Sequence, residues 1–317
     1  MREIIFVFLV LYFCVFTAFV CLYEIRKNYP PQIVTDGRNV AKSNSIVICG
    51  LARNLKPSQL VAKRIELEKI GSLFGDYKII IVENNSVDDT RARLLRWQIE
   101  NHRVVILTPE NDKGIVHDRT NLKTWKHEKS MPRGWSERIH RMAHLRETYL
   151  EYVKLNCSKS TFMLVVDMDI VGETNTDGLM LTLLDDDWSA VFVNGRVLRT
   201  ERKVEATVKQ MAVFQSRTLL SFPFVLETYD SIAFVPLTGS IKEEYLRIKA
   251  LNKSVCTPEA YTDVESAFNG YAIYKIDDLS NSSYISNEND ICEHITLHST
   301  LPRKKRLSTR WNGFFLN

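Results

Sequence analysis

The sequence predicts an α/β protein with a mostly parallel β-sheet flanked by helices, and three observations support this. Short apolar, β-branched runs alternate with amphipathic stretches from Ser45 onward. These runs carry few charges, which is typical of strands that are buried on both faces. One of them ends in Asp167 and Asp169, and open α/β sheets bind ligands at such strand ends.

The predicted elements follow one another in the order of a doubly wound sheet. The strands are expected at 45–51, 77–82, 103–107 and 161–166, and the helices at 58–74, 89–100 and 136–154. Ser58 can cap the first helix, in which Val61, Ile65 and Leu73 form one apolar stripe. The polar stretch 108–135 is long for a loop inside a compact domain, and such loops are usually functional or mobile.

A membrane anchor is expected at the N-terminus. Residues 4–23 contain no charge, and twenty residues of helix span about 30 Å, the thickness of a bilayer's hydrocarbon core. A cleaved signal peptide is the alternative, but its apolar region is usually shorter. Arg2 on one side nearly balances Arg26 and Lys27 on the other. The short tail 1–3 favours a single-pass type II protein with its bulk in a lumen.

The anchor is followed by an expected stem at 24–44, which shows no periodicity, and by one domain at 45–317. The 42 Lys and Arg residues against 38 Asp and Glu residues give a net charge of +4, too small to favour nucleic-acid binding. The four cysteines beyond the anchor allow one disulfide, Cys256 to Cys292, or unpaired buried thiols. Sequons at Asn84, Asn156, Asn252 and Asn281 permit a luminal location.

Asp167 and Asp169 are the first candidate metal ligands. Two carboxylates leaving one strand can surround a hard cation, and Mg²⁺ or Mn²⁺ prefers such oxygens while keeping positions for the phosphates of a nucleotide. A strand-end turn without metal is the alternative. The triplet Asp185–Asp187 has the same spacing, but it follows a helix-like stretch and fits a turn better.

These motifs resemble those of a known family. Ala52-Arg53-Asn54, the segment 83–90 (ENNSVDDT) and VVDMDI around Asp167 look like a GT-A glycosyltransferase, a Rossmann-like fold. The series formed by Arg141 and Arg146, the segment 266–274 (SAFNGYAIY) and Cys292-Glu293-His294 resembles the fungal capsule-associated α-1,3-mannosyltransferases and similar viral enzymes. The resemblance covers residues 45–317.

The resemblance implies roles for several residues. Ala52, Arg53 and Glu83 would hold the nucleoside, although Glu83 could instead accept hydrogen bonds within its own turn. Asp88 and Asp89 fit a helix cap better. Asp167 and Asp169 would bind Mn²⁺ or Mg²⁺ together with the donor's diphosphate.

A histidine completes the metal site in many such enzymes, and His294 is the first candidate here, followed by His298. Arg138, Arg141 and Arg146 lie on the helix before the aspartates, and Arg141 and Arg146 are the candidates to bind the diphosphate. At least one of the three arginines is expected on a solvated helix face. The basic run 303–306 could cover the diphosphate, but a solvated tail is the favoured interpretation.

The catalytic base is predicted as Asp263 or Glu265, with Asp230 and Glu293 as alternatives. A retaining enzyme would need no such base, and the sequence leaves this open. His140 and His144 have the spacing of a zinc pair, but without a third ligand they fit a helix surface.

The sequence therefore predicts a membrane-anchored glycosyltransferase of the Golgi or endoplasmic reticulum, or of a virion or host secretory membrane. It would move a hexose, by resemblance mannose from GDP-mannose, with UDP-sugars next, to a glycan acceptor. Dinucleotide, Walker A, GxSxG and HExxH motifs are absent. Two alternatives are a metal-dependent phosphohydrolase or nucleotidyltransferase, and a non-catalytic, membrane-tethered carbohydrate-binding protein.

Overall fold

A computed structural model describes residues 29–108, 135–200, 224–228, 232–237, 261–286 and 291–316. The elements within these ranges are α2 (Pro31–Lys42), β1 (Ser45–Ala52), α3 (Pro57–Gly71), β2 (Asp76–Glu83), α4 (Thr90–Glu100), β3 (Val104–Leu107), α5 (Trp135–Asn156), β4 (Phe162–Asp167), β5 (Val171–Thr174), α6 (Thr176–Thr182), β6 (Trp188–Thr200), β7 (Phe224–Thr228), β8 (Val235–Pro236), β9 (Tyr261–Ser266), β10 (Tyr271–Lys275), η3 (Ile276–Leu279), α9 (Glu293–Ser299) and β11 (Lys304–Leu316). The predicted order of strands and helices up to β4 is confirmed, with each end within three residues.

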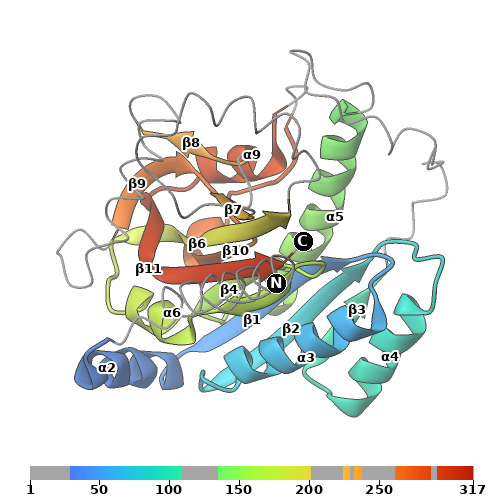
Figure 1. The fold of residues 1–317 in the computed structure, drawn as a ribbon, viewed down its shortest axis with the longest axis horizontal. Coiled ribbons are helices and arrows are strands. Elements are labelled where there is room, and N and C mark those ends of the chain that lie inside the picture. The colour runs from blue at the N-terminus through green and yellow to red at the C-terminus, as the bar shows by residue number, and fades with distance from the viewer. Residues whose placement is uncertain are drawn as a thin grey trace, which may run out of the picture.

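The described strands form one sheet in the order β3-β2-β1-β4-β10-β6-β11-β9-β8, with β5 beside β11 and β7 beside β6 (Figure 1). The prediction of an α/β fold is confirmed. Its parallel sheet holds for β3-β2-β1-β4. The rest of the sheet is mixed rather than mostly parallel. β6 and β11 pair parallel, but β10 runs antiparallel to both of its neighbours, and β5, β7 and β9 also pair antiparallel.

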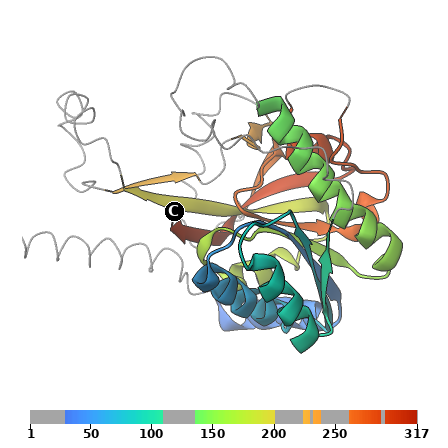
Figure 2. The same ribbon diagram turned by 90° about the vertical axis from the view of Figure 1, so that its right-hand side faces the viewer.

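Each face of the sheet packs against its own helices. In β1, Ile46 and Ile48 face a core shared with α3, α4 and α6, whereas Val47 and Cys49 face a core shared with α5 and α9. Figure 2 shows α5 on the opposite side of the sheet from α3 and α4. This alternation explains why the strands read as continuous apolar runs, since both sets of side chains are buried.

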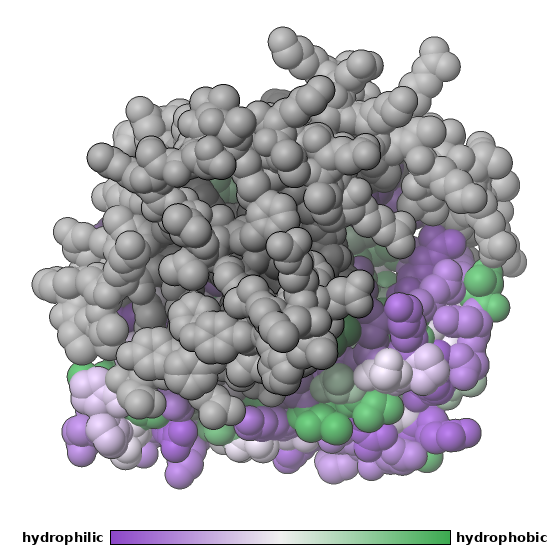
Figure 3. Space-filling model, in the orientation of Figure 1, coloured by the Kyte–Doolittle hydropathy of each residue, from purple (hydrophilic) through white to green (hydrophobic). Residues whose placement is uncertain are grey.

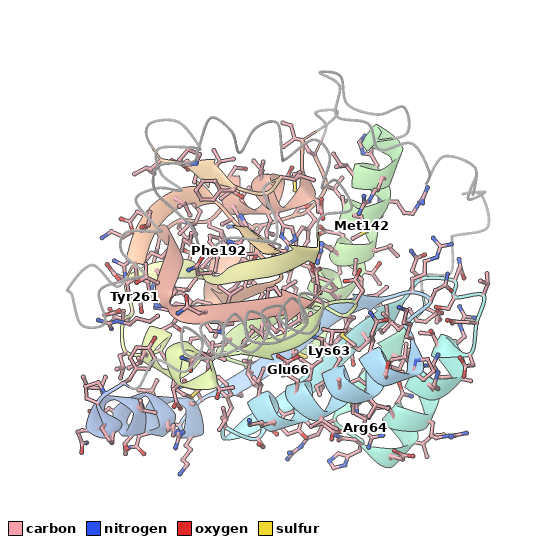
Figure 4. All side chains as sticks on the ribbon, viewed as in Figure 1. Lys63, Arg64, Glu66, Met142, Phe192 and Tyr261 are labelled. Carbon is pink, nitrogen blue, oxygen red and sulfur yellow. The ribbon has the colours of Figure 1, made fainter. Side chains whose placement is uncertain are left out.

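The apolar stripe predicted for α3 is wrong. Val61 and Ile65 are 58% and 62% exposed. The buried stripe is instead Leu60, Lys63, Leu67 and Ile70. Lys63 can be buried because its Nζ lies 2.8 Å from Glu66 and 2.6 Å from the hydroxyl of Tyr271 in β10. Lys63 and Glu66 are labelled on α3 in Figure 4. The helix also begins at Pro57, so Ser58 is not its cap.

The expected stem contains helix α2, which packs on the domain. Tyr29 donates a hydrogen bond to the carbonyl of Arg310, and α2 contacts α6. A stem without helical periodicity was predicted for residues 24–44, and this is wrong for residues 31–42, which form α2. Figure 3 shows that the lower edge, where α2, α3 and α4 lie in Figure 1, is mainly hydrophilic with scattered hydrophobic residues.

The expected anchor, residues 4–23, lies outside the described residues. Among the residues that the structure describes, no helix combines the length and the apolar character needed to cross a bilayer.

Gly37 provides a test of the docking of α2. A Cβ added at Gly37 would lie 2.4 Å from the carbonyl oxygen of Met180 in α6. Gly37→Ala should therefore lower the free energy of unfolding by about 1–3 kcal/mol, as overpacking does, although alanine is normally the better helix former. Asn39→Ala, on the exposed side of α2, is the control and should be neutral or stabilising. Urea denaturation of the two variants measures this, and a stabilised Gly37→Ala would contradict the packing.

Candidate functional site

The candidate site lies where the strand order of the sheet reverses. The chain runs from β1 outward through β2 to β3, and β4 then pairs on the other side of β1. Leu51 stands opposite Asp167 in β4, and Ala52 stands opposite Glu83 in β2. The carboxyl ends of these parallel strands therefore meet at one edge, the position at which open α/β sheets bind ligands.

The two aspartates leave β4 at this edge as predicted. Asp167 is the last residue of the strand and its backbone N–H donates to Gly270, while Asp169 is exposed and its backbone carbonyl accepts from Gln59 of α3. Met168 between them is buried against Gly50, where a Cβ would lie 2.8 Å from the Met168 Cγ. Burial of this one side chain holds the turn in place.

A buried arginine of α5 contacts Asp167. Nη2 of Arg146 lies 3.3 Å from Oδ1 of Asp167, and its Nε lies 3.1 Å from Oε1 of Glu293. Nη1 donates to the hydroxyl of Tyr149. Burial opposes the charge, but the Tyr149 oxygen and the carboxylates of Glu293 and Asp167 hold the pKa of Arg146 well above its ordinary value. Arg146 thus stays charged and joins β4 to α9.

The two histidines of α9 have different surroundings. His298 is fully buried between the hydroxyls of Ser266 and Tyr274, each 2.8 Å from one ring nitrogen, and burial lowers its pKa to about 3. Neither ring nitrogen of His294 has a hydrogen-bond partner. Its ring stacks on Phe268 with centroids 3.9 Å apart, and burial together with the charge of Arg146 keeps its pKa well below the ordinary value.

The structure does not bring His294 to the two aspartates as a third metal ligand. Among the described residues, no three His, Cys, Asp or Glu side chains form a group that could hold a metal ion. Arg146, rather than His294, contacts Asp167. Both ring nitrogens of His298 are hydrogen-bonded to the hydroxyls of Ser266 and Tyr274, so neither is available to a metal ion. The donor set that remains, Asp167 and Asp169, consists of the carboxylates that Mg²⁺ and Mn²⁺ prefer, and it leaves positions for phosphate oxygens.

Glu83 accepts hydrogen bonds within its own turn, which is the alternative to holding a nucleoside. Its carboxylate is fully buried and accepts hydrogen bonds from the N–H of Ser86 and from Nε of Arg91, both at 2.6 Å. Asp88 accepts from the N–H of Thr90 at the start of α4, and hydrogen bonding with the side chain and then the backbone of Thr90 lowers the pKa of Asp88. A helix cap was predicted for Asp88 and Asp89. Asp89 occupies the N-cap position but its side chain makes no capping hydrogen bond, whereas Asp88 accepts from the first helical N–H.

The loop after β1 remains beside the aspartates. Ala52 is buried at the strand end and Arg53 is partly exposed. Asn54 follows with a φ of 48° and accepts a hydrogen bond from the N–H of Val87, which joins this loop to the one after β2. Of the residues predicted to hold a nucleoside, Arg53 is the side chain left accessible at this edge.

The three arginines of α5 lie in different environments. Arg138 is exposed, Arg141 is partly buried and Arg146 is buried. A solvated position for at least one of them is confirmed by Arg138. His144 is also exposed and His140 is partly so, as expected of a helix surface rather than a zinc pair.

The predicted catalytic carboxylates belong to ion pairs on another part of the sheet. Asp263 lies 3.2 Å from Arg306 and Glu265 lies 3.5 Å from Lys305, and both cations come from β11. The basic run is therefore neither a solvated tail nor a cover for the site, because it begins a long strand. Asp230 lies outside the described residues, whereas Glu293, the other alternative, is in the Arg146 cluster.

Three further predictions concern surface turns and cysteines. Asp185–Asp187 form the turn between α6 and β6, as expected of the second acidic triplet. Cys49 and Cys157 are buried free thiols. Cys256 lies outside the described residues, so the bridge to Cys292 stays a prediction.

Asn269 is a residue that the sequence analysis did not single out. It is fully buried, its φ is 55°, and neither its Nδ2 nor its Oδ1 has a hydrogen-bond partner. An unsatisfied buried polar group costs about 1–3 kcal/mol. The Asn-Gly dipeptide at 269–270, which favours positive φ, was the available signal in the sequence.

No family model and no curated protein sequence matches this chain. Among solved structures, it is similar to GalNAc-T7 with UDP, GalNAc and Mn²⁺, at 9% identity and a TM-score of 0.49, over 87% of this chain and 44% of that one. It is also similar to mannosyltransferase PcManGT from Pyrobaculum calidifontis in complex with GDP-Man and Mn²⁺, at 12% identity and a TM-score of 0.33, over 52% of this chain and 43% of that one. The chain thus spans less than half of either protein. Because both TM-scores are below 0.5, we assign neither a fold family nor an activity from them.

Gly50→Ala tests how the aspartate turn is held. The added methyl would collide with Met168, so we expect a loss of about 1–3 kcal/mol in unfolding free energy and a displaced turn. If Asp169 is the metal ligand that the sequence predicts, binding of Mn²⁺ and nucleotide should weaken as well. Thermal denaturation with and without Mn²⁺ and nucleotide measures both effects. The result that would count against this packing is an unchanged melting temperature together with unchanged binding.

His298 makes stability depend on pH. The unfolded chain binds a proton near the ordinary histidine pKa of about 6.5, but the folded chain does so only near 3. Stability should therefore fall as the pH drops from 6.5 toward 3, by about 2 kcal/mol between pH 7 and pH 5 from this residue alone. His298→Gln is less stable at pH 7, and its deficit should shrink by that amount at pH 5. Urea midpoints at both pH values measure the gap, and a constant gap would show that His298 is not buried neutral.

Proposed function

We propose that this chain is a metal-dependent glycosyltransferase of the GT-A type that moves a hexose from a nucleotide sugar to a glycan acceptor. The observation that carries the proposal is the pair Asp167 and Asp169, which leaves β4 where the strand order reverses. An exposed carboxylate at this edge suits a cation that binds a ligand's phosphates. The buried Arg146 cluster behind Asp167 gives the pair a fixed support.

Asp167 and Asp169 would hold a Mn²⁺ or Mg²⁺ ion. When bound, such an ion neutralises the charge that grows on the departing nucleoside diphosphate. Arg146 orients Asp167, and the buried Met168 fixes the backbone between the two carboxylates. The protein's part is thus to present two oxygens at a set position, which removes the cost of reorganising them during the reaction.

The nucleoside would lie against the end of β1. Ala52 and Arg53 directly follow Leu51, which pairs with Asp167 in the sheet, and the side chain of Gln59 in α3 donates a hydrogen bond to the Asp169 carbonyl. Arg141, on the same helix as Arg146, is the proposed contact for the diphosphate because a guanidinium matches phosphate oxygens. Glu83 is not part of the proposed site, since its carboxylate is fully buried in its own turn.

For the donor we propose GDP-mannose, on the resemblance of the motifs to the capsule-associated mannosyltransferases, with UDP-sugars as the next candidates. Asp263 and Glu265, the predicted bases, are already paired with Arg306 and Lys305 of β11. We therefore propose a retaining route, which needs no general base.

We also propose that residues 4–23 anchor the chain as a type II membrane protein facing the Golgi or endoplasmic reticulum lumen. The uncharged run ends five residues before Asn28, and the described chain starts with Tyr29 tied to Arg310. A domain attached so soon after its anchor would act close to the membrane surface.

Binding of nucleoside diphosphates to the full-length chain in detergent tests the proposal. GDP with Mn²⁺, at about 100 times its dissociation constant, should add about 2.7 kcal/mol of stability, visible as a higher melting temperature. Asp169→Asn should abolish this shift, because it removes one of two metal-binding carboxylates. Asp186→Asn, in the exposed turn after α6, is the matched control and should keep the shift.

The other outcomes discriminate among the alternatives. A response to UDP alone would keep the transferase and replace the donor. Release of phosphate or sugar without a glycan acceptor, and without preference among sugars, would favour a phosphohydrolase. Glycan binding that survives Asp169→Asn, with no response to either nucleotide, would favour a carbohydrate-binding protein and contradict the proposal.

A further inference from the structure

Asn269 and His294 are two buried polar side chains that the proposed chemistry does not use. Asn269 is 0% exposed and His294 is 2% exposed. Both polar atoms of each side chain, the amide Nδ2 and Oδ1 and the imidazole Nδ1 and Nε2, lack a hydrogen-bond partner. Buried polar groups are satisfied in the great majority of cases, so each of these two residues needs an explanation.

Contacts place both residues beside the metal-binding edge. Phe268 precedes Asn269 and stacks on His294, and the guanidinium of Arg146 lies 5.1 Å from the centroid of the same ring. Gly270 follows Asn269 and accepts the hydrogen bond from the N–H of Asp167. Asn269 is thus next in sequence to Gly270, which bonds to Asp167, and to Phe268, which contacts Arg146. His294 reaches the same place through its stacking on Phe268.

The backbone at Asn269 is fixed rather than adaptable. A Cβ added at Gly195 of β6 would lie 2.2 Å from the Asn269 carbonyl oxygen, so the two backbones are in close contact. Asn269 also holds a φ of 55°, which few residues other than glycine and asparagine adopt readily. The amide is thus held near the site by a backbone that has little freedom to turn it elsewhere.

The kind of ligand follows from what these groups can bond. A neutral imidazole offers one donor and one acceptor, and the amide offers two donors and an oxygen acceptor. A phosphate supplies acceptors only and would leave the imidazole's own acceptor unpaired. A polyhydroxylated ring suits both residues, since each hydroxyl donates one hydrogen bond and accepts others.

We infer that Asn269 and His294 form a subsite that binds hydroxyl groups of the transferred sugar. This inference rests on the proposed function and adds a specificity subsite to it. Neighbouring His298, with both nitrogens bonded to hydroxyls of the protein, has the purely structural role that His294 lacks.

The test compares nucleotides with nucleotide sugars in the full-length chain. Melting temperatures are measured with Mn²⁺ and GDP, GDP-mannose, UDP or UDP-glucose. The variants are His294→Phe, which keeps the stacked ring without its nitrogens, and Asn269→Gly, which keeps the positive φ without the amide. His298→Phe is the matched control.

We expect the wild type to gain extra stability from the sugar beyond that from the nucleotide alone. His294→Phe without ligand should be at least as stable as the wild type, because two unsatisfied atoms are removed, whereas His298→Phe should be less stable. Both site variants should keep the nucleotide shift, lose the extra shift from the sugar, and bind the nucleotide sugar at least tenfold more weakly. His298→Phe should keep the extra shift.

Opposite results overturn the inference in recognisable ways. Site variants that keep the full extra shift exclude a role in sugar binding. A His294→Phe variant destabilised as much as His298→Phe, with Asn269→Gly keeping the extra shift, shows that the imidazole is structural. A wild type that responds to no nucleotide contradicts the proposed function itself, and the subsite falls with it.

Discussion

The buried charge of Arg146 is the constraint on which the candidate site depends. An isolated guanidinium inside a protein is costly, so it is tolerated only with anionic partners in good geometry. Here the partners are Asp167 at the end of β4 and Glu293 at the start of α9. The charge of one side chain on α5 therefore requires a central strand and a C-terminal helix to meet at the same point.

The neighbours of Arg146 extend this connection. Tyr149, one turn along α5, bonds to both Arg146 and the hydroxyl of Tyr284. Glu147 accepts hydrogen bonds from the N–H of Tyr284 and the hydroxyl of Ser283. One helix thus fixes the end of β4, the segment around Tyr284 and the first residue of α9, and the support behind Asp167 is a single hydrogen-bonded network, which is stiffer than separate contacts.

Local sequence patterns predict the strands and helices in the first half of the fold. They fail where a polar residue occupies a position in the core. The β1, β2, β3 and β4 runs are apolar on both faces, so their burial and parallel pairing could be predicted. Lys63 hid the true buried stripe of α3, because its partner Tyr271 lies 208 residues away. In the same way, the sequence around Gly37 does not show that this residue packs against the backbone of Met180 in α6. Without that contact, the segment that forms α2 is predicted to be a stem.

The second half of the sheet depends on pairings that no short pattern encodes. β11 begins with Lys304, Lys305 and Arg306 of the basic run 303–306. The run was predicted to be a solvated tail, but these three cations pair with Asp187, Glu265 and Asp263. Those ion pairs also remove Asp263 and Glu265 from the site. The sequence identifies which carboxylates could act as a base or a metal ligand. Only the fold shows which of them are already paired with an arginine or lysine side chain.

The two aspartates that the sequence did identify are not equivalent, and the reason is again Arg146. Asp167 compensates a buried charge, so replacing it would leave Arg146 with one anionic partner and disturb the fold as well as any ligand. Asp169 is exposed, and within the described residues its hydrogen bond is made by the backbone carbonyl, which accepts from Gln59. Because the Asp169 side chain compensates no buried charge among the described residues, replacing it should disturb the fold less than replacing Asp167, which makes Asp169 the better position for testing the proposed metal site.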